Sequence, residues 1–126
     1  MMEKNNPRVL IVDDERIIAD SLAMILNRSG FDARAAYSGE MMIETARNFQ
    51  PDMLVTDVIM TGITGIEAAI MVREMLPSCK ILLFSGQAIT ADLLEMARAR
   101  NHEFELLAKP VHPTALIARL RSSVCV

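Results

Sequence analysis

Short apolar runs alternate with segments of helical periodicity along the whole of this 126-residue chain. Each run has the length of a buried strand, and in the segment after it apolar residues recur every three or four positions. This alternation is typical of βα units, which place their strands in one parallel sheet. We therefore expect five strands, at 9–12, 33–37, 53–57, 80–84 and 104–108, and helices over about 15–28, 38–49, 64–76, 90–100 and from 113 onward.

The second run is the most polar and fits an edge strand, where one side is less covered. With right-handed crossovers this placement gives the strand order 2-1-3-4-5. The fold class is then α/β: a doubly wound, flavodoxin-like parallel sheet with helices on both faces. The first and third strands are neighbours in this order, at the point where the winding reverses. Asp13, Asp14 and Asp57 follow these two strands, so we expect them to meet beyond the carboxyl ends.

The composition suits one folded domain and excludes several classes of protein. The chain is 52% hydrophobic with a net charge of -3, which excludes a disordered chain and leaves no basic footprint for nucleic acid. Segment 1–6 lacks the apolar core of a signal peptide, and no apolar stretch approaches the roughly twenty residues of a membrane span. We expect a disordered tail over 1–6, one domain over 7–126, a cytoplasmic location, and no direct contact with nucleic acid or membranes.

The helical periodicity also predicts core positions. We expect a core face on the first helix and on the last, and methionines that fill gaps in the core. These positions are Ile18, Leu22, Ile25 and Leu26, then Leu116, Leu120 and Val124, and Met24, Met42 and Met71. Cys79 and Cys125 are expected to be a buried thiol and a free terminal one rather than a disulfide.

The side chains expected to meet beyond the carboxyl ends of the strands have complementary chemistry. Three carboxylates this close repel, so one of them holds a proton unless a cation joins them. Oxygen ligands without nearby Cys or His favour Mg²⁺, with Mn²⁺ as the alternative. Ser85 and Lys109, at the ends of the fourth and fifth strands, supply a hydrogen bond and a charge suited to phosphate oxygens. Because an Asp carboxylate can accept a phosphoryl group, the set indicates a Mg²⁺-dependent phosphoryl site.

Four short motifs stand in order at the ends of these strands: Asp13-Asp14, Asp57, Ser85-Gly86 and Lys109-Pro110. Each by itself has an ordinary interpretation, such as a helix start, a turn or a strand exit. Together, in this context, they resemble the receiver domain of two-component response regulators. The resemblance covers about residues 8–124. It implies a phosphoacceptor domain rather than an enzyme acting on other substrates, and an output through a changed protein-binding surface.

The resemblance also implies a metal set. Asp14 and Asp57 would hold Mg²⁺ directly, joined by the backbone carbonyl of Ile59. Asp13 would act nearby or through water.

For the phosphoryl group, the resemblance implies that Asp57 accepts it from the phosphohistidine of a sensor histidine kinase or a phosphotransfer protein. Ser85 would bond the phosphoryl group and act as a switch residue, and Lys109 would pair with it. The bond between Lys109 and Pro110 is cis in the family.

Several positions depart from the family's pattern. Thr61 stands where the family often has a proline. Leu106 replaces the Tyr or Phe that turns inward on phosphorylation, so the aromatic switch is absent. Phe104 lies on the same face of that strand, and a core role is expected for it. Ile59 and Gln87 occupy positions that influence attack by water on the phosphoryl group, and because an apolar side chain does not orient that water, slow self-dephosphorylation is expected.

Several alternatives stay open. An Asp-nucleophile phosphatase or phosphotransferase needs a substrate lid, and the sequence has no insertion long enough for one. The same sheet order holds FMN in flavodoxin-like proteins, but here acids follow the first strand where Ser, Thr and Gly would cradle phosphate. A degenerate receiver that only binds partners is a further alternative, as is a receiver cut from a longer chain. Kinase, downstream target and oligomeric state do not follow from these patterns.

Two further groups of side chains have no assigned role. Arginines of the fourth and fifth helices are expected to be surface charges, with a docking face as the alternative. Two histidines fall in loops without metal-ligand spacing. These are Arg98, Arg100, Arg119 and Arg121, and His102 and His112.

Overall fold

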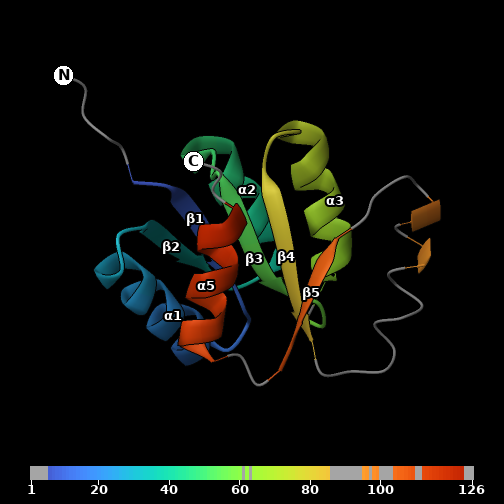
Figure 1. Cartoon of the computed structure of the whole chain (residues 1–126). Coiled ribbons are helices and arrows are strands. Elements are labelled where there is room, and N and C mark those ends of the chain that lie inside the picture. The colour runs from blue at the N-terminus through green and yellow to red at the C-terminus, as the bar shows by residue number, and fades with distance from the viewer. Residues whose placement is uncertain are drawn as a thin grey trace.

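A five-stranded sheet forms the centre of the protein in the computed structural model (Figure 1). The structure describes residues 6–60, 62, 64–85, 95, 96, 98, 99, 104–109 and 112–123. The order β2-β1-β3-β4-β5 confirms the predicted one. Every neighbouring pair is parallel, so the carboxyl ends of all the strands lie at one edge of the sheet. The strands are β1 (Arg8–Val12), β2 (Asp32–Ala36), β3 (Met53–Asp57), β4 (Lys80–Ser85) and β5 (Glu105–Ala108).

Helices cover both faces of the sheet, as the doubly wound fold requires (Figure 1). Helices α1 (Arg16–Arg28) and α5 (Pro113–Ser123) pack on one face, and α2 (Gly39–Phe49) and α3 (Gly65–Met75) on the other. Because side chains alternate along a strand, β1 gives Val9 and Ile11 to the first face and Leu10 and Val12 to the second. Strands buried on both sides read as continuous apolar runs, which is why the sequence revealed them.

Local signals position the helices that flank the sheet. The Ser38 hydroxyl caps α2 by accepting a hydrogen bond from the Met41 N–H at 3.0 Å. Helix α3 begins with a capping box, in which Thr64 and Glu67 each satisfy a backbone N–H of the other. Gly30, with a φ of 99°, follows the end of α1 in the left-handed region that glycine favours.

Helical periodicity placed three residues in the core that the structure exposes. Ile18 is 36% exposed, Met24 52% and Met71 50%. On α1 the buried residues are Ala19, Leu22, Ala23 and Leu26, so Ile18 and Met24 lie outside the stripe that faces the sheet. Of the other predicted core residues that the structure describes, Ile25 is half-buried. The core prediction is confirmed for the buried residues Leu22, Leu26, Met42, Leu116 and Leu120.

Some predictions lie outside the described residues. They concern residues 1–5, Thr61, Gly86, Gln87, Arg100, His102, Pro110 with its cis bond, Val124 and Cys125, and the helix over 90–100 apart from residues 95, 96, 98 and 99. Cys79 is confirmed as a buried thiol, and burial raises its pKa to about 12. Within the described ranges, no helix is both long and apolar enough to cross a membrane.

Candidate functional site

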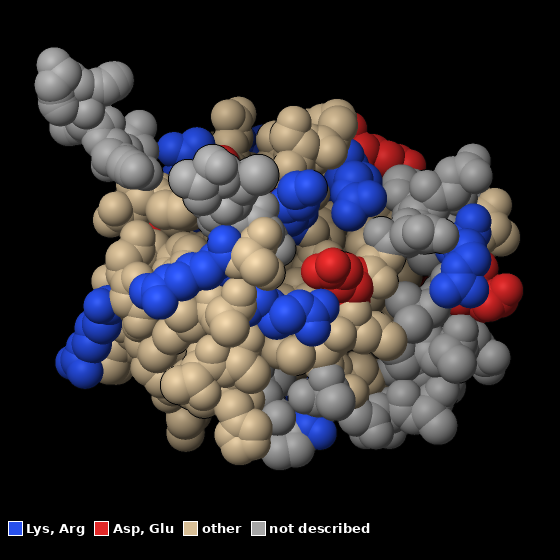
Figure 2. Space-filling model, viewed as in Figure 1, with Lys and Arg blue, Asp and Glu red and all other residues tan. Residues whose placement is uncertain are grey.

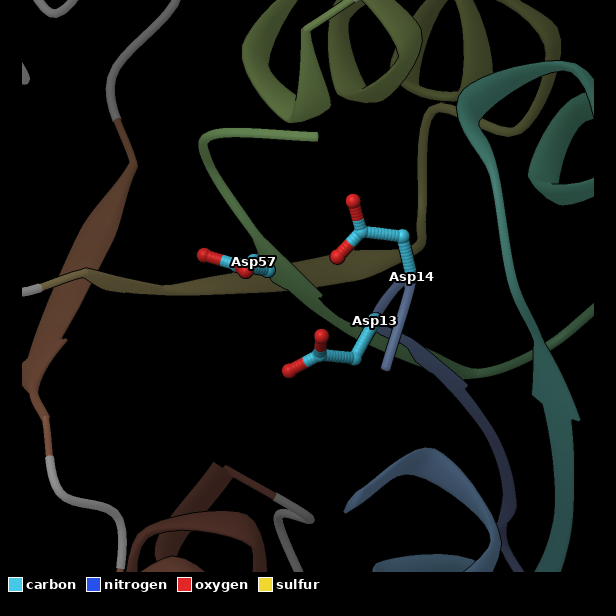
Figure 3. Close-up of side chains that lie close together, drawn as sticks. All are labelled: Asp13, Asp14 and Asp57. Atoms are coloured by element: carbon cyan, nitrogen blue, oxygen red, sulfur yellow. The ribbon is translucent and has the colours of Figure 1, made fainter. Parts of the chain in front are cut away.

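Three aspartates meet at the carboxyl edge of the sheet, between β1 and β3 (Figure 3). Asp13 and Asp14 directly follow β1, and Asp57 is the last residue of β3. The two strands are direct neighbours, with Val12 opposite Thr56. One carboxylate oxygen of each aspartate lies within 4.8 Å of the others, as the sheet order predicted. Asp13 and Asp57 are buried, whereas Asp14 is exposed.

Lys109 reaches this cluster from the end of β5. Its Nζ donates a hydrogen bond of 3.0 Å to Oδ2 of Asp57. It also lies 5.3 Å from the centre of the buried Phe84 ring, within the range of a cation–π contact. The Lys109 side chain is 33% exposed and that of Asp57 only 8%, so solvent screens this ion pair less than a surface pair.

Ser85 ends β4, the strand between β3 and β5. Asp57 is opposite Phe84 in the β3/β4 pairing, and Ser85 is opposite Ala108 in the β4/β5 pairing. The Ser85 carbonyl accepts a hydrogen bond from the Lys109 N–H at 3.4 Å. The half-buried Ser85 therefore lies at the same edge as Asp57 and Lys109, as expected from the sequence.

The electrostatics of Asp57 reflect opposing effects. Burial raises the pKa of the Asp57 carboxyl above its ordinary value, because desolvation disfavours the charged form. The hydrogen bond and charge of Lys109 lower this pKa, the charge of Asp14 raises it, and the backbone N–H of Ile59 lowers it. Asp57 is thus a buried acid whose charged form Lys109 stabilises.

Asp13 has one satisfied and one unsatisfied carboxylate oxygen. Oδ1 accepts a hydrogen bond from the Glu15 N–H at 3.0 Å. Oδ2 is buried and has no hydrogen-bond partner among the residues that the structure describes. Burial raises the pKa of this carboxyl; the Glu15 N–H lowers it, and the charge of Asp57 raises it. The bond to Glu15 was not anticipated, although an Asp that binds the backbone two residues on is a common turn signal.

The donor set fits a hard divalent cation. Asp13, which has an unsatisfied buried oxygen, lies beside two further carboxylates, and carboxylate oxygens are the ligands that Mg²⁺ takes in proteins. Burial is the main cause of the raised pKa of Asp13 and of Asp57, and a cation here would offset the smaller contribution from repulsion between the acids.

The two described positions that depart from the family's pattern are both on the surface. Ile59 is 41% exposed and Leu106 is 43% exposed. Phe104 is half-buried, packs against the core on the α2/α3 face, and lies beneath the Arg73 guanidinium at 5.2 Å. The core role expected for Phe104 is therefore confirmed.

Basic side chains spread across the face that α5 occupies, with few acidic ones among them (Figure 2). The described arginines that the sequence singled out nevertheless have local partners. The contacts join Arg98 to Glu95 at 3.1 Å, Arg119 to Glu105 at 3.4 Å, and Arg121 to the Ser29 carbonyl at 3.0 Å. These contacts favour ordinary surface charge over a dedicated docking face.

Comparison with known proteins agrees with the fold. Residues 9–121 match the family model of the response regulator receiver domain. The DNA-binding response regulator MtrA of Mycobacterium tuberculosis (strain ATCC 25618 / H37Rv) is 26% identical over 121 residues, 96% of this chain and 52% of the relative. The transcriptional regulatory protein YvrH of Bacillus subtilis is 31% identical over 118 residues, 93% of this chain and 48% of the relative.

Solved structures show the same architecture. A CheY-like receiver domain protein from Methanospirillum hungatei JF-1 has a TM-score of 0.84 at 22% identity, covering 94% of each chain. The chemotaxis response regulator CheY4 of Vibrio cholerae has a TM-score of 0.82 at 24% identity, covering 95% of this chain and all of that one (100%).

The chain belongs to the response regulator receiver domain family. Such domains are the regulatory phosphoacceptors of two-component signal transduction, as the sequence motifs predicted. The chain spans about half the length of the curated relatives it matches.

Proposed function

We propose that this receiver accepts a phosphoryl group on Asp57, in a Mg²⁺-dependent reaction, from a sensor histidine kinase or a phosphotransfer protein. The observation that carries the proposal is a buried carboxylate that is bonded to a lysine ammonium and lies within 4.8 Å of two other carboxylates. The cation would be held by Asp14, Asp57 and the Ile59 carbonyl, with Asp13 adjacent or bound through water. When bound, Mg²⁺, or Mn²⁺ in its place, supplies positive charge for phosphate oxygens.

The chain's own residues divide the remaining tasks. A carboxylate oxygen of Asp57 attacks phosphorus, an O–P bond forms, and the P–N bond of the donor phosphohistidine breaks with its electron pair going to the imidazole. Lys109 keeps Asp57 ionised beforehand and pairs with a phosphoryl oxygen afterwards. Ser85 donates a hydrogen bond to another phosphoryl oxygen and acts as the switch residue.

The donor protein would dock beside the acid cluster, over α1. A hollow of about 580 Å³ lies there, and Ile17, Ile18, Phe84, Lys109 and Pro113 are among its lining residues. Ile17 is 81% exposed, which places a large apolar side chain in water unless a partner covers it. Lys109 lines this hollow and also bonds Asp57, so a partner seated here would lie next to the acceptor.

Docking over α1 is separable from the chemistry. In Ile17→Ser, transfer from a phosphorylated phosphotransfer domain that labels the wild type should slow roughly tenfold. Labelling by a small-molecule phosphodonor should not change. Equal slowing with both donors would contradict a docking role for Ile17.

The output would be a changed protein-binding surface. Phosphorylation adds about -1.5 to -2 charges at the buried Asp57, which shifts the balance between two surface states. Since Leu106 is not aromatic, the change would proceed without the inward-turning ring of the family. The proposal includes a cytoplasmic location, one domain over 7–126, and no direct contact of this domain with nucleic acid.

The phosphoryl group should be long-lived, because Ile59 offers no polar group to orient an attacking water. We expect a lifetime well beyond seconds for phosphorylated Asp57 and a shorter one in Ile59→Asn. Intact mass measured at intervals after removal of the phosphodonor gives this lifetime. A wild-type lifetime of seconds would count against this part of the proposal.

Incubation with a small phosphodonor, with and without Mg²⁺, tests the central claim. Intact mass should show one added phosphoryl group in the wild type only when the metal is present. No added mass in the wild type would leave a degenerate receiver that only binds partners. Continued multiple turnover of a phosphoester would instead favour the Asp-nucleophile phosphatase, and we propose that the domain supports only its own phosphorylation and dephosphorylation.

A further inference from the structure

The first residue of α3, Gly65, lies against the backbone of Asp57. Its N–H donates a hydrogen bond of 2.8 Å to the Val58 carbonyl, which ties the start of α3 to the end of β3. A Cβ at position 65 would overlap the Asp57 carbonyl oxygen and lie 2.9 Å from the carbonyl carbon, closer than real Cβ atoms approach any neighbour. The helix can come this near only because residue 65 has no side chain.

Both sides of this contact are held by other interactions. On the strand side, Asp57 is paired with Phe84 inside the sheet. On the helix side, the capping box of Thr64 and Glu67 holds the first turn, and Ile66 is buried. A side chain at position 65 would therefore move the end of β3, the first turn of α3, or both, by about 1 Å.

We propose that Gly65 is a positioning residue for the phosphoryl-accepting carboxylate. Its bare Cα allows α3 to press on the Asp57 carbonyl and so sets where the strand ends. That position keeps Oδ2 of Asp57 3.0 Å from Nζ of Lys109 and next to the other two acids. The inference rests on the proposed function, because positioning has a readout only if Asp57 is the acceptor.

Gly65→Ala is the direct test, and Gly30→Ala is its matched control. Gly30 has a φ of +99°, and a Cβ there would have nothing within 4 Å, so alanine strains the backbone far from the acids. At saturating Mg²⁺ and small phosphodonor, labelling of Gly65→Ala should slow roughly a hundredfold, since a misplacement of about 1 Å costs that much. Labelling of Gly30→Ala should match the wild type, although urea unfolds both variants earlier.

A second pair of variants covers the case in which Gly65→Ala does not fold. Thr64→Ala removes the cap that holds Gly65 in place, and Ser38→Ala removes the equivalent cap of α2. We expect labelling to slow several-fold in Thr64→Ala and to stay unchanged in Ser38→Ala, at similar losses of stability.

The outcomes separate the two proposals. Labelling at the wild-type rate in a folded Gly65→Ala, or equal slowing in both members of either pair, would overturn the positioning role. Absence of labelling in the wild type would overturn the proposed function itself. Slowing confined to Gly65→Ala and Thr64→Ala supports the positioning role.

Discussion

Strand β3 has an aspartate at each end, and the surroundings of the two differ. Asp52 precedes the strand, is exposed, and accepts a hydrogen bond of 2.8 Å from the Arg8 N–H. Asp57 ends the strand, is buried, and pairs with Lys109 beside two other acids. The first carboxylate joins two chain segments in water, whereas the second is buried beside two other acids and a lysine.

Strand β5 repeats the contrast with ion pairs. At its start, Glu105 pairs with Arg119 at 3.4 Å, with side chains 66% and 39% exposed. Just past its end, Lys109 pairs with Asp57 at 3.0 Å, with side chains 33% and 8% exposed. Solvent screens the first ion pair strongly and the second ion pair much less. In both comparisons, the charged groups at the carboxyl edge of the sheet are less exposed than those at the opposite edge.

The largest expected difference separates the two aspartates of β3. Asp57→Asn should abolish labelling by a small phosphodonor in Mg²⁺, because the amide is not a nucleophile for phosphorus. Asp52→Asn should label at the wild-type rate and lose only about 1 kcal/mol of unfolding free energy, since one hydrogen bond weakens. Intact mass and urea denaturation measure the two effects, and retained labelling in Asp57→Asn would sink the choice of acceptor.

The two ion pairs of β5 should differ next. Lys109→Met leaves Asp57 without its donor, so labelling should slow roughly a hundredfold, and the unfolding free energy should fall by about 1 to 2 kcal/mol. Arg119→Met should change the unfolding free energy by less than about 0.5 kcal/mol and leave labelling intact. Similar effects of the two substitutions would mean that burial does not distinguish these pairs.

Mg²⁺ should stabilise the protein by binding at the carboxyl edge of the sheet, and not at the opposite edge. At about a hundred times its dissociation constant it should raise the unfolding free energy of the wild type by about 2.7 kcal/mol. Asp52→Asn should keep this gain in urea titrations, and Asp14→Asn should lose most of it. A full gain in Asp14→Asn would place the cation elsewhere.

The smallest expected effect is on the pH dependence of the unfolding free energy, measured without metal. Burial raises the pKa of Asp13 and of Asp57 above the ordinary 3.8, so the folded state binds more protons than the unfolded state across that interval. Stability should then be greatest below about pH 4 from these two groups and decrease as pH rises through their folded pKa values. Asp13→Asn should flatten this decrease, because the amide does not titrate. Urea midpoints between pH 4 and 7 that stay parallel in wild type and variant would contradict the effect.

Much of this arrangement follows from sequence because it depends on neighbours along the chain. Runs such as Val9 to Val12 mark buried strands, and the polar run at 33–37 marks the edge. Parallel strands end at one edge, so the meeting of Asp13, Asp14 and Asp57 was also predictable. The exposure of Ile18 was not, because periodicity shows that a helix has an apolar stripe but not how far the sheet covers it.

Patterns along the chain were enough to predict the strand order, the family, and the set of residues at the carboxyl edge. The hydrophobic periodicity and the order of the motifs can both be read directly from the sequence. Which of the two adjacent acids, Asp13 or Asp14, is buried became known from the folded molecule alone, as did the close approach of α3 to Asp57. Both depend on how helices and strands pack against one another in three dimensions. Desolvation and steric contact arise from that packing, and they separate Asp57 from Asp52 on the same strand.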